Sequence, residues 1–318
     1  MGIWIGVDGG GSKTEFVAIN ELGVRLASYT TGGLDYHQYG LKVCCDRLAK
    51  GVERLSLVAA EENILGMGIG MPTYGEGGAE DEYVANQFRA MFLNIPTTIV
   101  NDAKVGWAGA LAMNPGVNIV AGTGSIAFGC DGNGNCARSG GWSELFSDEG
   151  SGYWLGRMAL GLFAKESDGR APKSALYYLM KTHLDIRHDE EICSIARQKV
   201  FTSRHNVAKL QLILANAALQ GDESAAWLYN LAGRELASCV HAVVKKLNFK
   251  GVANVSYSGG IFNVGDLILA PFKNALGRGV VLHEPILCPE VGAALIAVEQ
   301  FQPNSLQNLK DILVRNCK

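Results

Sequence analysis

The sequence has no long apolar run and no cluster of basic residues. No stretch approaches the roughly 20 apolar residues of a membrane span, and the first residues lack the basic and then apolar segments of a secretory signal. The net charge is −3, and the 28 lysines and arginines are dispersed, which argues against a surface for nucleic acid or an anionic membrane. We therefore expect a cytoplasmic protein that binds neither nucleic acid nor membrane.

The cysteines form no metal-binding or redox pattern. No two of them are spaced as C-x-x-C, and no histidine lies at the spacing of a zinc ligand from them. We expect free, mostly buried thiols in a reducing compartment. The eight residues are Cys44, Cys45, Cys130, Cys136, Cys193, Cys239, Cys288 and Cys317.

Apolar residues, by contrast, are plentiful. Of the 318 residues, 48% are hydrophobic and 19% are charged, a composition typical of folded globular proteins and unlike that of disordered chains. A chain of this length is expected to form about two domains.

A glycine-rich turn joins the first two predicted strands. Residues 3–7 and 15–19 have strand-like patterns, and between them Asp8 is followed by Gly-Gly-Gly-Ser-Lys-Thr. Consecutive glycines let backbone N–H groups approach an anion, and the hydroxyls of Ser12 and Thr14 add donors. A carboxylate beside a phosphate requires a divalent cation between them, so Asp8 is a candidate metal ligand. The alternative is a hairpin turn without a ligand; a Walker A loop would be followed by a helix, not a strand.

The same order of elements starts again in the second half of the chain. Residues 1–112 predict three strands followed by alternating helices and strands. Strands predicted at 117–121 and 126–130 then flank Gly-Thr-Gly-Ser at 122–125. This duplication indicates two similar α/β domains whose glycine loops face a common cleft.

A long helical region precedes a third glycine motif. Residues 151–247 predict helices that serve mainly as scaffold, and a strand at 253–258 ends at Gly259 and Gly260. A helix is predicted to begin near Asn263. Glycines between a buried strand and a helix N-terminus give a nucleotide a place to lie against the backbone.

Six segments follow one another in order over nearly the whole chain. They are Asp8-Gly-Gly-Gly-Ser-Lys-Thr14, Asn101-Asp-Ala103, Gly122-Thr-Gly-Ser125, Gly140-Gly-Trp142, Asp148-Glu-Gly-Ser151 and Ser258-Gly-Gly260. Together they resemble the N-acetylglucosamine kinase family and the related BadF/BadG/BcrA/BcrD ATPases of the actin, sugar kinase and Hsp70 superfamily. The resemblance implies an α/β fold of two duplicated ribonuclease-H-like (actin-like ATPase) domains. Each would contain a mixed five-stranded sheet, with the active-site cleft between the domains.

The domain bounds follow from the same resemblance. The N-terminal domain would comprise residues 1–115, joined by a C-terminal helix at about 303–318. The C-terminal domain would comprise residues 116–302, with a helical insertion.

The resemblance also implies an ATP-dependent amino-sugar kinase. Such an enzyme transfers the γ-phosphoryl group, at C6 by family analogy, to N-acetylglucosamine, N-acetylmuramic acid or glucosamine. Asp102 would act as general base and Asp8 would hold Mg²⁺ through water, because phosphoryl transfer depends on positioning and on neutralised charge. Relatives are often dimers, so a homodimer is expected. Asp102 and Asp148 have a simpler alternative role as helix N-caps.

Site residues carry over position by position. The ATP site would comprise Gly10, Gly11, Ser12, Lys13, Thr14, Gly122, Thr123, Gly124, Ser125, Gly259, Gly260 and Asn263. The sugar site would comprise Asp35, Tyr36, His37, Asp102, Gly141, Trp142, Ser143, Asp148 and Gly152. The chain departs from the family at Ser143 and Ser147, where glycine is common. It departs again at 35–37, where an asparagine is usual.

Two other functions remain open. One is the ATPase that activates 2-hydroxyacyl-CoA dehydratases, which needs cysteine ligands for a [4Fe–4S] cluster; Cys130 and Cys136 lie near the second glycine loop. The other is a non-catalytic sugar sensor, which is expected to lack the base that Asp102 supplies.

Overall fold

The computed structural model describes residues 2–58 and 63–317. These residues form two compact units. Unit 1 contains Met1–Asn118, Gly129–Asn135 and His283–Lys318, and unit 2 contains Ile119–Phe128 and Cys136–Leu282. No helix among the described residues is long and apolar enough to cross a membrane.

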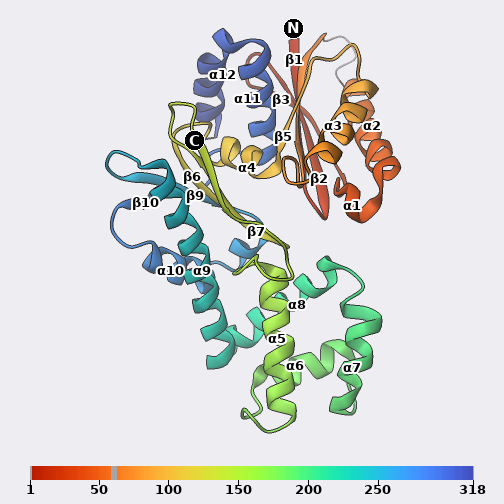
Figure 1. Cartoon of the computed structure of the whole chain (residues 1–318), viewed down its shortest axis with the longest axis vertical. Helices are drawn as coiled ribbons and strands as arrows, with labels where there is room; N and C mark the ends of the chain where they lie inside the picture. Colours follow the sequence, from red (N-terminus) through yellow and green to blue (C-terminus); the bar gives the residue numbers. More distant parts are fainter. Residues whose placement is uncertain (1, 59–62, 318) are drawn as a thin grey trace. The chain divides into compact units, whose positions relative to one another are not determined.

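Unit 1 is built on a five-stranded sheet in the order β3-β2-β1-β4-β5 (Figure 1). Its strands are β1 (Gly2–Gly9), β2 (Lys13–Asn20), β3 (Arg25–Gly32), β4 (Asn63–Met71) and β5 (Thr97–Asn101). The first three strands are antiparallel, whereas β1, β4 and β5 are parallel. The carboxyl ends of β1, β4 and β5 therefore lie at the same edge of the sheet, and the first glycine loop follows β1 there.

Helices cover both faces of this sheet (Figure 1). Apolar residues of α2 and α3 pack on one face, and those of α11 and α12 pack on the other. The helices of unit 1 are α1 (Tyr36–Tyr39), α2 (Leu41–Val58), α3 (Ala79–Met91), α4 (Asp102–Ala110), α11 (Pro289–Phe301) and α12 (Pro303–Asn316).

Glycines bring α11 unusually close to the sheet and to α4. A Cβ atom at Gly6 would lie 1.8 Å from the backbone oxygen of Glu290, and one at Gly68 would lie 1.9 Å from that of Ala293. A Cβ at Gly292 would lie 2.3 Å from the backbone nitrogen of Gly109 in α4. This packing explains why α11 belongs to unit 1, although the predicted bounds placed residues 289–301 in the C-terminal domain.

Unit 2 contains most of the second five-stranded sheet, in the order β10-β9-β6-β7-β8. Its strands are β6 (Gly116–Ala121), β7 (Ser125–Cys130), β8 (Cys136–Gly140), β9 (Ala253–Ser258) and β10 (Val280–Leu282). The helices α9 (Glu223–Leu247) and α10 (Asp266–Leu276) pack together, and the 3-10 helix η3 (Gly260–Val264) follows β9. The predicted α/β class with two five-stranded mixed sheets is confirmed.

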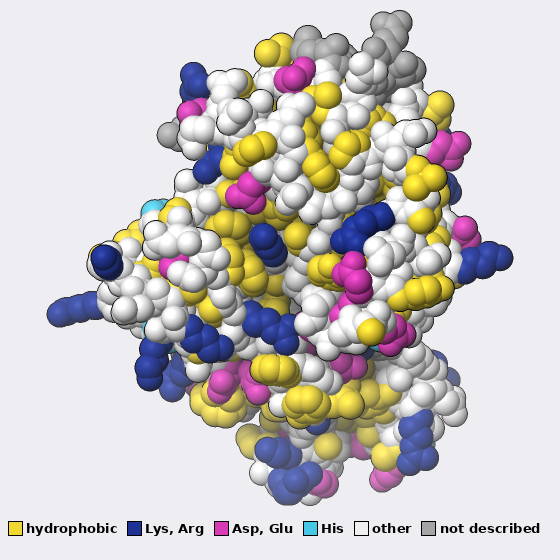
Figure 2. All heavy atoms as spheres, turned by 45° about the horizontal axis from the view of Figure 1, so that its top comes forward, with side chains coloured by type: hydrophobic (Ala, Val, Ile, Leu, Met, Phe, Trp, Pro, Cys, Tyr) yellow, Lys and Arg dark blue, Asp and Glu magenta, His cyan; other side chains and the backbone are white. Residues whose placement is uncertain are grey.

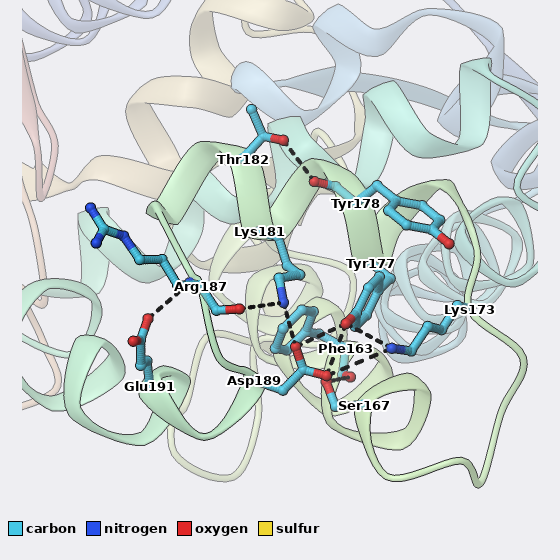
Figure 3. A network of polar contacts seen from close by, with 10 residues as sticks. All are labelled: Phe163, Ser167, Lys173, Tyr177, Tyr178, Lys181, Thr182, Arg187, Asp189 and Glu191. Atoms are coloured by element: carbon cyan, nitrogen blue, oxygen red, sulfur yellow. Dashed lines mark hydrogen bonds and ion pairs between the residues drawn. The ribbon is translucent and has the colours of Figure 1, made fainter.

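The helical insertion follows β8. It contains α5 (Gly152–Ser167), α6 (Ala175–Leu184), η1 (Asp189–Glu191), α7 (Ile192–Ile195), the π-helix η2 (Ala196–Val200) and α8 (Arg204–Leu219). Figure 3 shows a polar network within it, centred on Tyr177 and Asp189. The Tyr177 ring stacks on Phe163 with ring centroids 5.4 Å apart.

The prediction that all cysteines are free is wrong for two of them. Cys130 and Cys136, on either side of the β7–β8 turn, are disulfide-bonded, whereas the other six are free. The turn closes through a hydrogen bond from the Asp131 nitrogen to the Asn135 oxygen, 3.0 Å long. C-x-x-C spacing does not predict this pair, because a hairpin brings more widely spaced cysteines together.

On the face seen in Figure 2, lysine and arginine side chains lie scattered among acidic, apolar and neutral ones. This face carries no continuous basic surface.

Candidate active site

The first glycine loop is tightly folded at the tip of the β1–β2 hairpin. The Gly10 nitrogen donates to the Lys13 oxygen at 2.9 Å, and the Gly10 oxygen accepts from the Leu34 nitrogen at 3.0 Å. A Cβ at Gly33 would lie 2.5 Å from the Gly11 oxygen, whereas one at Gly11 would meet no atom within 4 Å. The backbone around Gly11 therefore has open space beside it, as an anion-binding loop requires.

Two side chains of this loop make other contacts. The buried hydroxyl of Thr14 donates to the Gly32 oxygen at 2.9 Å, and exposed Lys13 pairs with Glu15 at 2.8 Å. The Thr14 side chain therefore stabilises the loop by binding the neighbouring strand. The backbone of Thr14 remains part of the predicted phosphate site.

Asp8 lies on the face of β1 that is covered by α11. Side chains alternate along a strand, so Asp8 shares its face with Gly6, whose α-carbon touches the start of α11. The pKa of Asp8 is raised to about 8, mainly because the carboxyl is desolvated. The negative charges of Asp102, Glu290 and Glu15 raise it further. The nearby negative charges therefore oppose ionisation of Asp8.

Asp102 is the first residue of α4. Its Oδ1 accepts from the Ala103 nitrogen at 2.9 Å, and the N-cap residue Asn101 accepts from the same nitrogen at 2.9 Å. Desolvation raises the pKa of Asp102 to about 7, with smaller contributions from Glu76 and Asp35. Capping is thus mainly the role of Asn101, and Asp102 has a pKa suited to accepting a proton near neutral pH.

The segment predicted to face the sugar is partly structural. Asp35 is buried and caps α1, accepting from the nitrogens of His37 and Gln38 at 3.1 and 3.3 Å. The buried Tyr36 hydroxyl donates to Asp81 at 2.8 Å. Of the three predicted residues, His37 has the exposed side chain.

Sequence reasoning missed Asp81 and the loop that it holds. One carboxylate oxygen of Asp81 accepts from the nitrogens of Gly75, Glu76 and Gly77 at 2.6 to 2.9 Å. This anchor places the charge of Glu76 near enough to influence Asp102. The sequence signal for this anchor is a glycine-rich turn followed within six residues by an aspartate.

In unit 2 the second glycine loop is bonded to the segment that opens α5. The Gly152 nitrogen donates to the Gly122 oxygen at 2.8 Å, and the Tyr153 nitrogen donates to the Thr123 oxygen at 3.2 Å. The Ser125 hydroxyl donates to the Glu149 oxygen at 2.8 Å. The predicted phosphate loop and sugar segment thus form one assembly.

The third glycine motif lies beside the second loop. A Cβ at Gly259, where φ is +101°, would lie 2.3 Å from the Ala121 oxygen. Only glycine suits both this conformation and this close approach. Gly260 and the exposed Asn263 follow in η3, so the structure brings the second and third motifs together within unit 2.

Asp148 is buried and strained, with φ at +59°. Burial raises its pKa to about 6, against the opposing effect of Arg204. Its Oδ1 atom makes no hydrogen bond to any described residue. The N-cap of α5 is Ser151, which accepts from the Trp154 nitrogen at 3.2 Å, so the alternative role of Asp148 as a helix cap is wrong.

The remaining predicted sugar residues lie at the end of β8. Gly141 has φ at +67°, and the Trp142 side chain is 67% exposed, so Trp142 is not a core residue. The Arg138 guanidinium lies 4.8 Å from the centre of its ring. The Ser143 hydroxyl accepts from the Leu145 nitrogen at 3.2 Å.

The chain matches known proteins over most of its length. The model of the BadF/BadG/BcrA/BcrD ATPase family matches residues 5–297. An N-acetyl-D-glucosamine kinase of Dictyostelium discoideum is 28% identical over 313 residues, covering 93% of this chain and 98% of that protein. An N-acetylmuramic acid/N-acetylglucosamine kinase of Clostridium acetobutylicum is also 28% identical, covering 86% and 89%.

Solved structures share the fold. A candidate N-acetylglucosamine kinase from Chromobacterium violaceum superposes with a TM-score of 0.77 at 23% identity, covering 93% of this chain and 99% of that one. A ROK family glucokinase from Streptomyces griseus superposes with a TM-score of 0.59 at 18% identity, covering 94% and 100%. At these identities the likeness concerns the fold alone.

Proposed function

The chain belongs to the BadF/BadG/BcrA/BcrD ATPase family, and we propose that it is an ATP-dependent amino-sugar kinase. The observation that carries the proposal is the position of Asp102 directly after β5, at the sheet edge where parallel β1 leads into the first glycine loop. Desolvation there raises the pKa of Asp102 to about 7. Two relatives that match most of the chain are named as kinases of N-acetylglucosamine, one of them also of N-acetylmuramic acid.

Asp102 would act as the general base. The oxygen of a sugar hydroxyl, at C6 by analogy with the family, forms a bond to the γ-phosphorus while the bond from that phosphorus to the bridging oxygen breaks. The hydroxyl proton passes to the Asp102 carboxylate, and ADP leaves with the bonding electron pair. A base whose pKa lies near the working pH is the most effective in such a step.

The residues around Asp8 fit a divalent cation. Its carboxyl shares a desolvated region with Asp102 and Glu290, and their mutual repulsion would be relieved by positive charge. Bound Mg²⁺ would neutralise the phosphate oxygens of ATP. Asp8 would orient this ion through its water ligands, since Mg²⁺ keeps much of its hydration shell.

The two glycine loops would hold the ATP phosphates, and Asp148 would hold the sugar. The unpaired Oδ1 of Asp148 supports this assignment, because a buried carboxylate oxygen can accept a sugar hydroxyl. We also propose that the protein is a homodimer.

A coupled assay of ATP turnover tests the proposal. The sugars are N-acetylglucosamine, N-acetylmuramic acid, glucosamine, N-acetylmannosamine and glucose, with a reaction lacking sugar as control. We expect strong stimulation by one of the first three, with a 6-phosphorylated product identified by NMR. No stimulation by any of them would contradict the kinase function.

The dehydratase activator is less compatible with the structure. Cluster ligands must be thiolates, whereas Cys130 and Cys136 are joined in disulfide linkage.

A further inference from the structure

Arg204 lies directly beside the second glycine loop. It is the first residue of α8, after the N-cap Ser203, which accepts from the Asn206 nitrogen at 3.2 Å. A Cβ at Gly124 would lie 3.3 Å from the Nη2 atom of Arg204 and 2.6 Å from Oδ2 of Asp148. A guanidinium group therefore occupies the space next to the loop that is expected to bind phosphate.

Two carboxylates hold this guanidinium loosely. Nε lies 3.3 Å from Oε2 of Glu144, and Nη2 lies 3.4 Å from Oδ2 of Asp148. Nε is buried and makes no hydrogen bond of good geometry to a described residue. By comparison, surface Arg170 makes contacts of 2.7 to 3.0 Å with Asp168. The pairing of Arg204 is thus long for a charge-assisted contact.

We propose that Arg204 contacts the γ-phosphoryl group of ATP during transfer, an assignment that rests on the kinase function proposed above. A phosphoryl group presents several charged oxygens that can accept hydrogen bonds from the planar guanidinium. The two carboxylates, at 3.3 and 3.4 Å, are weaker partners for it. An arginine that reaches the transferring phosphoryl group stabilises the charge of the transition state.

The sugar would control this contact. Asp148, the residue expected to accept sugar hydroxyls, is also one of the two carboxylates that hold Arg204. Hydroxyl donors on Asp148 reduce its attraction for the guanidinium, so sugar binding favours movement of Arg204 toward the phosphoryl group. Without sugar, Arg204 stays with Glu144 and Asp148, which restrains hydrolysis of ATP by water.

The test compares binding of AMP-PNP, which has a γ-phosphoryl group, with binding of ADP, which lacks one. Arg204→Met, Arg204→Lys and, as a matched control, exposed Arg197→Met in η2 are compared with the unaltered protein. With the sugar that stimulates turnover present at saturation, calorimetry measures the affinity for AMP-PNP and for ADP. We expect Arg204→Met to weaken AMP-PNP binding about tenfold or more and to leave ADP binding unchanged. We expect kcat to fall about 10²-fold, with partial recovery in Arg204→Lys and no change in Arg197→Met.

The outcomes distinguish this inference from the function on which it rests. If the unaltered protein phosphorylates no sugar, the kinase function fails. If it is active and Arg204→Met keeps its kcat, or loses AMP-PNP and ADP affinity equally, the inference is overturned. A loss confined to N-acetylmuramic acid also overturns it, because Arg204 would then bind the acidic group of that sugar.

Glu144→Gln provides an independent test. Removing one of the two carboxylates should release Arg204, raise the affinity for AMP-PNP in the absence of sugar, and increase hydrolysis of ATP without sugar several-fold. Unchanged AMP-PNP affinity and unchanged hydrolysis would contradict the proposed control by the sugar.

Discussion

Two aspartates in different parts of the molecule have opposite environments. Asp189, in the helical insertion, accepts from Lys181 at 2.7 Å and from the Tyr177 hydroxyl at 2.9 Å (Figure 3), and these partners lower its pKa. Asp102, in unit 1, accepts from one backbone amide, and desolvation raises its pKa to about 7. A carboxylate with strong partners stabilises structure, whereas one without them is available for proton transfer.

Exchanging each carboxyl for an amide tests this contrast most strongly. Asp102→Asn should lower kcat by about 10² to 10⁴, because the general base is lost, while the midpoint of thermal unfolding stays the same or rises. Asp189→Asn is the matched control and should do the reverse, lowering the midpoint and leaving kcat unchanged. Steady-state kinetics and calorimetry on both variants decide the matter; equal kcat values for the two would contradict the assignment.

Replacing a glycine where β1 packs against α11, near Asp8, should destabilise the protein far more than replacing a glycine in the helical insertion. In Gly6→Ala the new methyl group would meet the Glu290 carbonyl, a backbone atom that cannot turn away. We expect a loss of about 3 kcal/mol in the free energy of unfolding, from strain between β1 and α11. Chemical denaturation measures this, and a loss below about 1 kcal/mol would show that α11 shifts easily.

Activity should depend on pH through Asp102. Only the ionised carboxylate accepts a proton, so kcat/KM for the sugar should fall about tenfold per pH unit below about 7. Rates measured from pH 5 to 9 test this expectation. An acidic limb centred near the ordinary aspartate pKa of about 3.9 would contradict it.

The effects of pH on stability should have opposite signs at the two aspartates. Because the folded-state pKa of Asp102 is raised, its contribution is fully present below about 3.9 and is lost as the pH rises through about 7. Because that of Asp189 is lowered, its contribution is present above about 3.9 and is lost as the pH falls. The difference in unfolding midpoint between each Asn variant and the unaltered protein should therefore change with pH in opposite directions.

Some residues of the site could be predicted from local sequence patterns, and others could not. The glycine loops and Asp102 follow strand ends, so local patterns identified them and the duplicated fold. Arg204 lies 56 residues after Asp148 in a region predicted to be scaffold, and Asp81 lies 45 residues after Tyr36. Their roles depend on packing of distant helices, which periodicity does not report. The hydrogen bond from the Tyr36 hydroxyl to Asp81 could not be predicted for the same reason.

The smallest expected effect is at Gly161, in the middle of α5 in the insertion. A Cβ there would meet no atom within 4 Å, so Gly161→Ala should raise the free energy of unfolding by about 0.5 to 1 kcal/mol, because alanine restricts the unfolded chain and favours a helix. Chemical denaturation beside Gly6→Ala gives the comparison directly. If both substitutions destabilise equally, close packing against α11 is not what requires glycine at position 6. If their signs differ, close packing in unit 1 is what requires glycine at position 6.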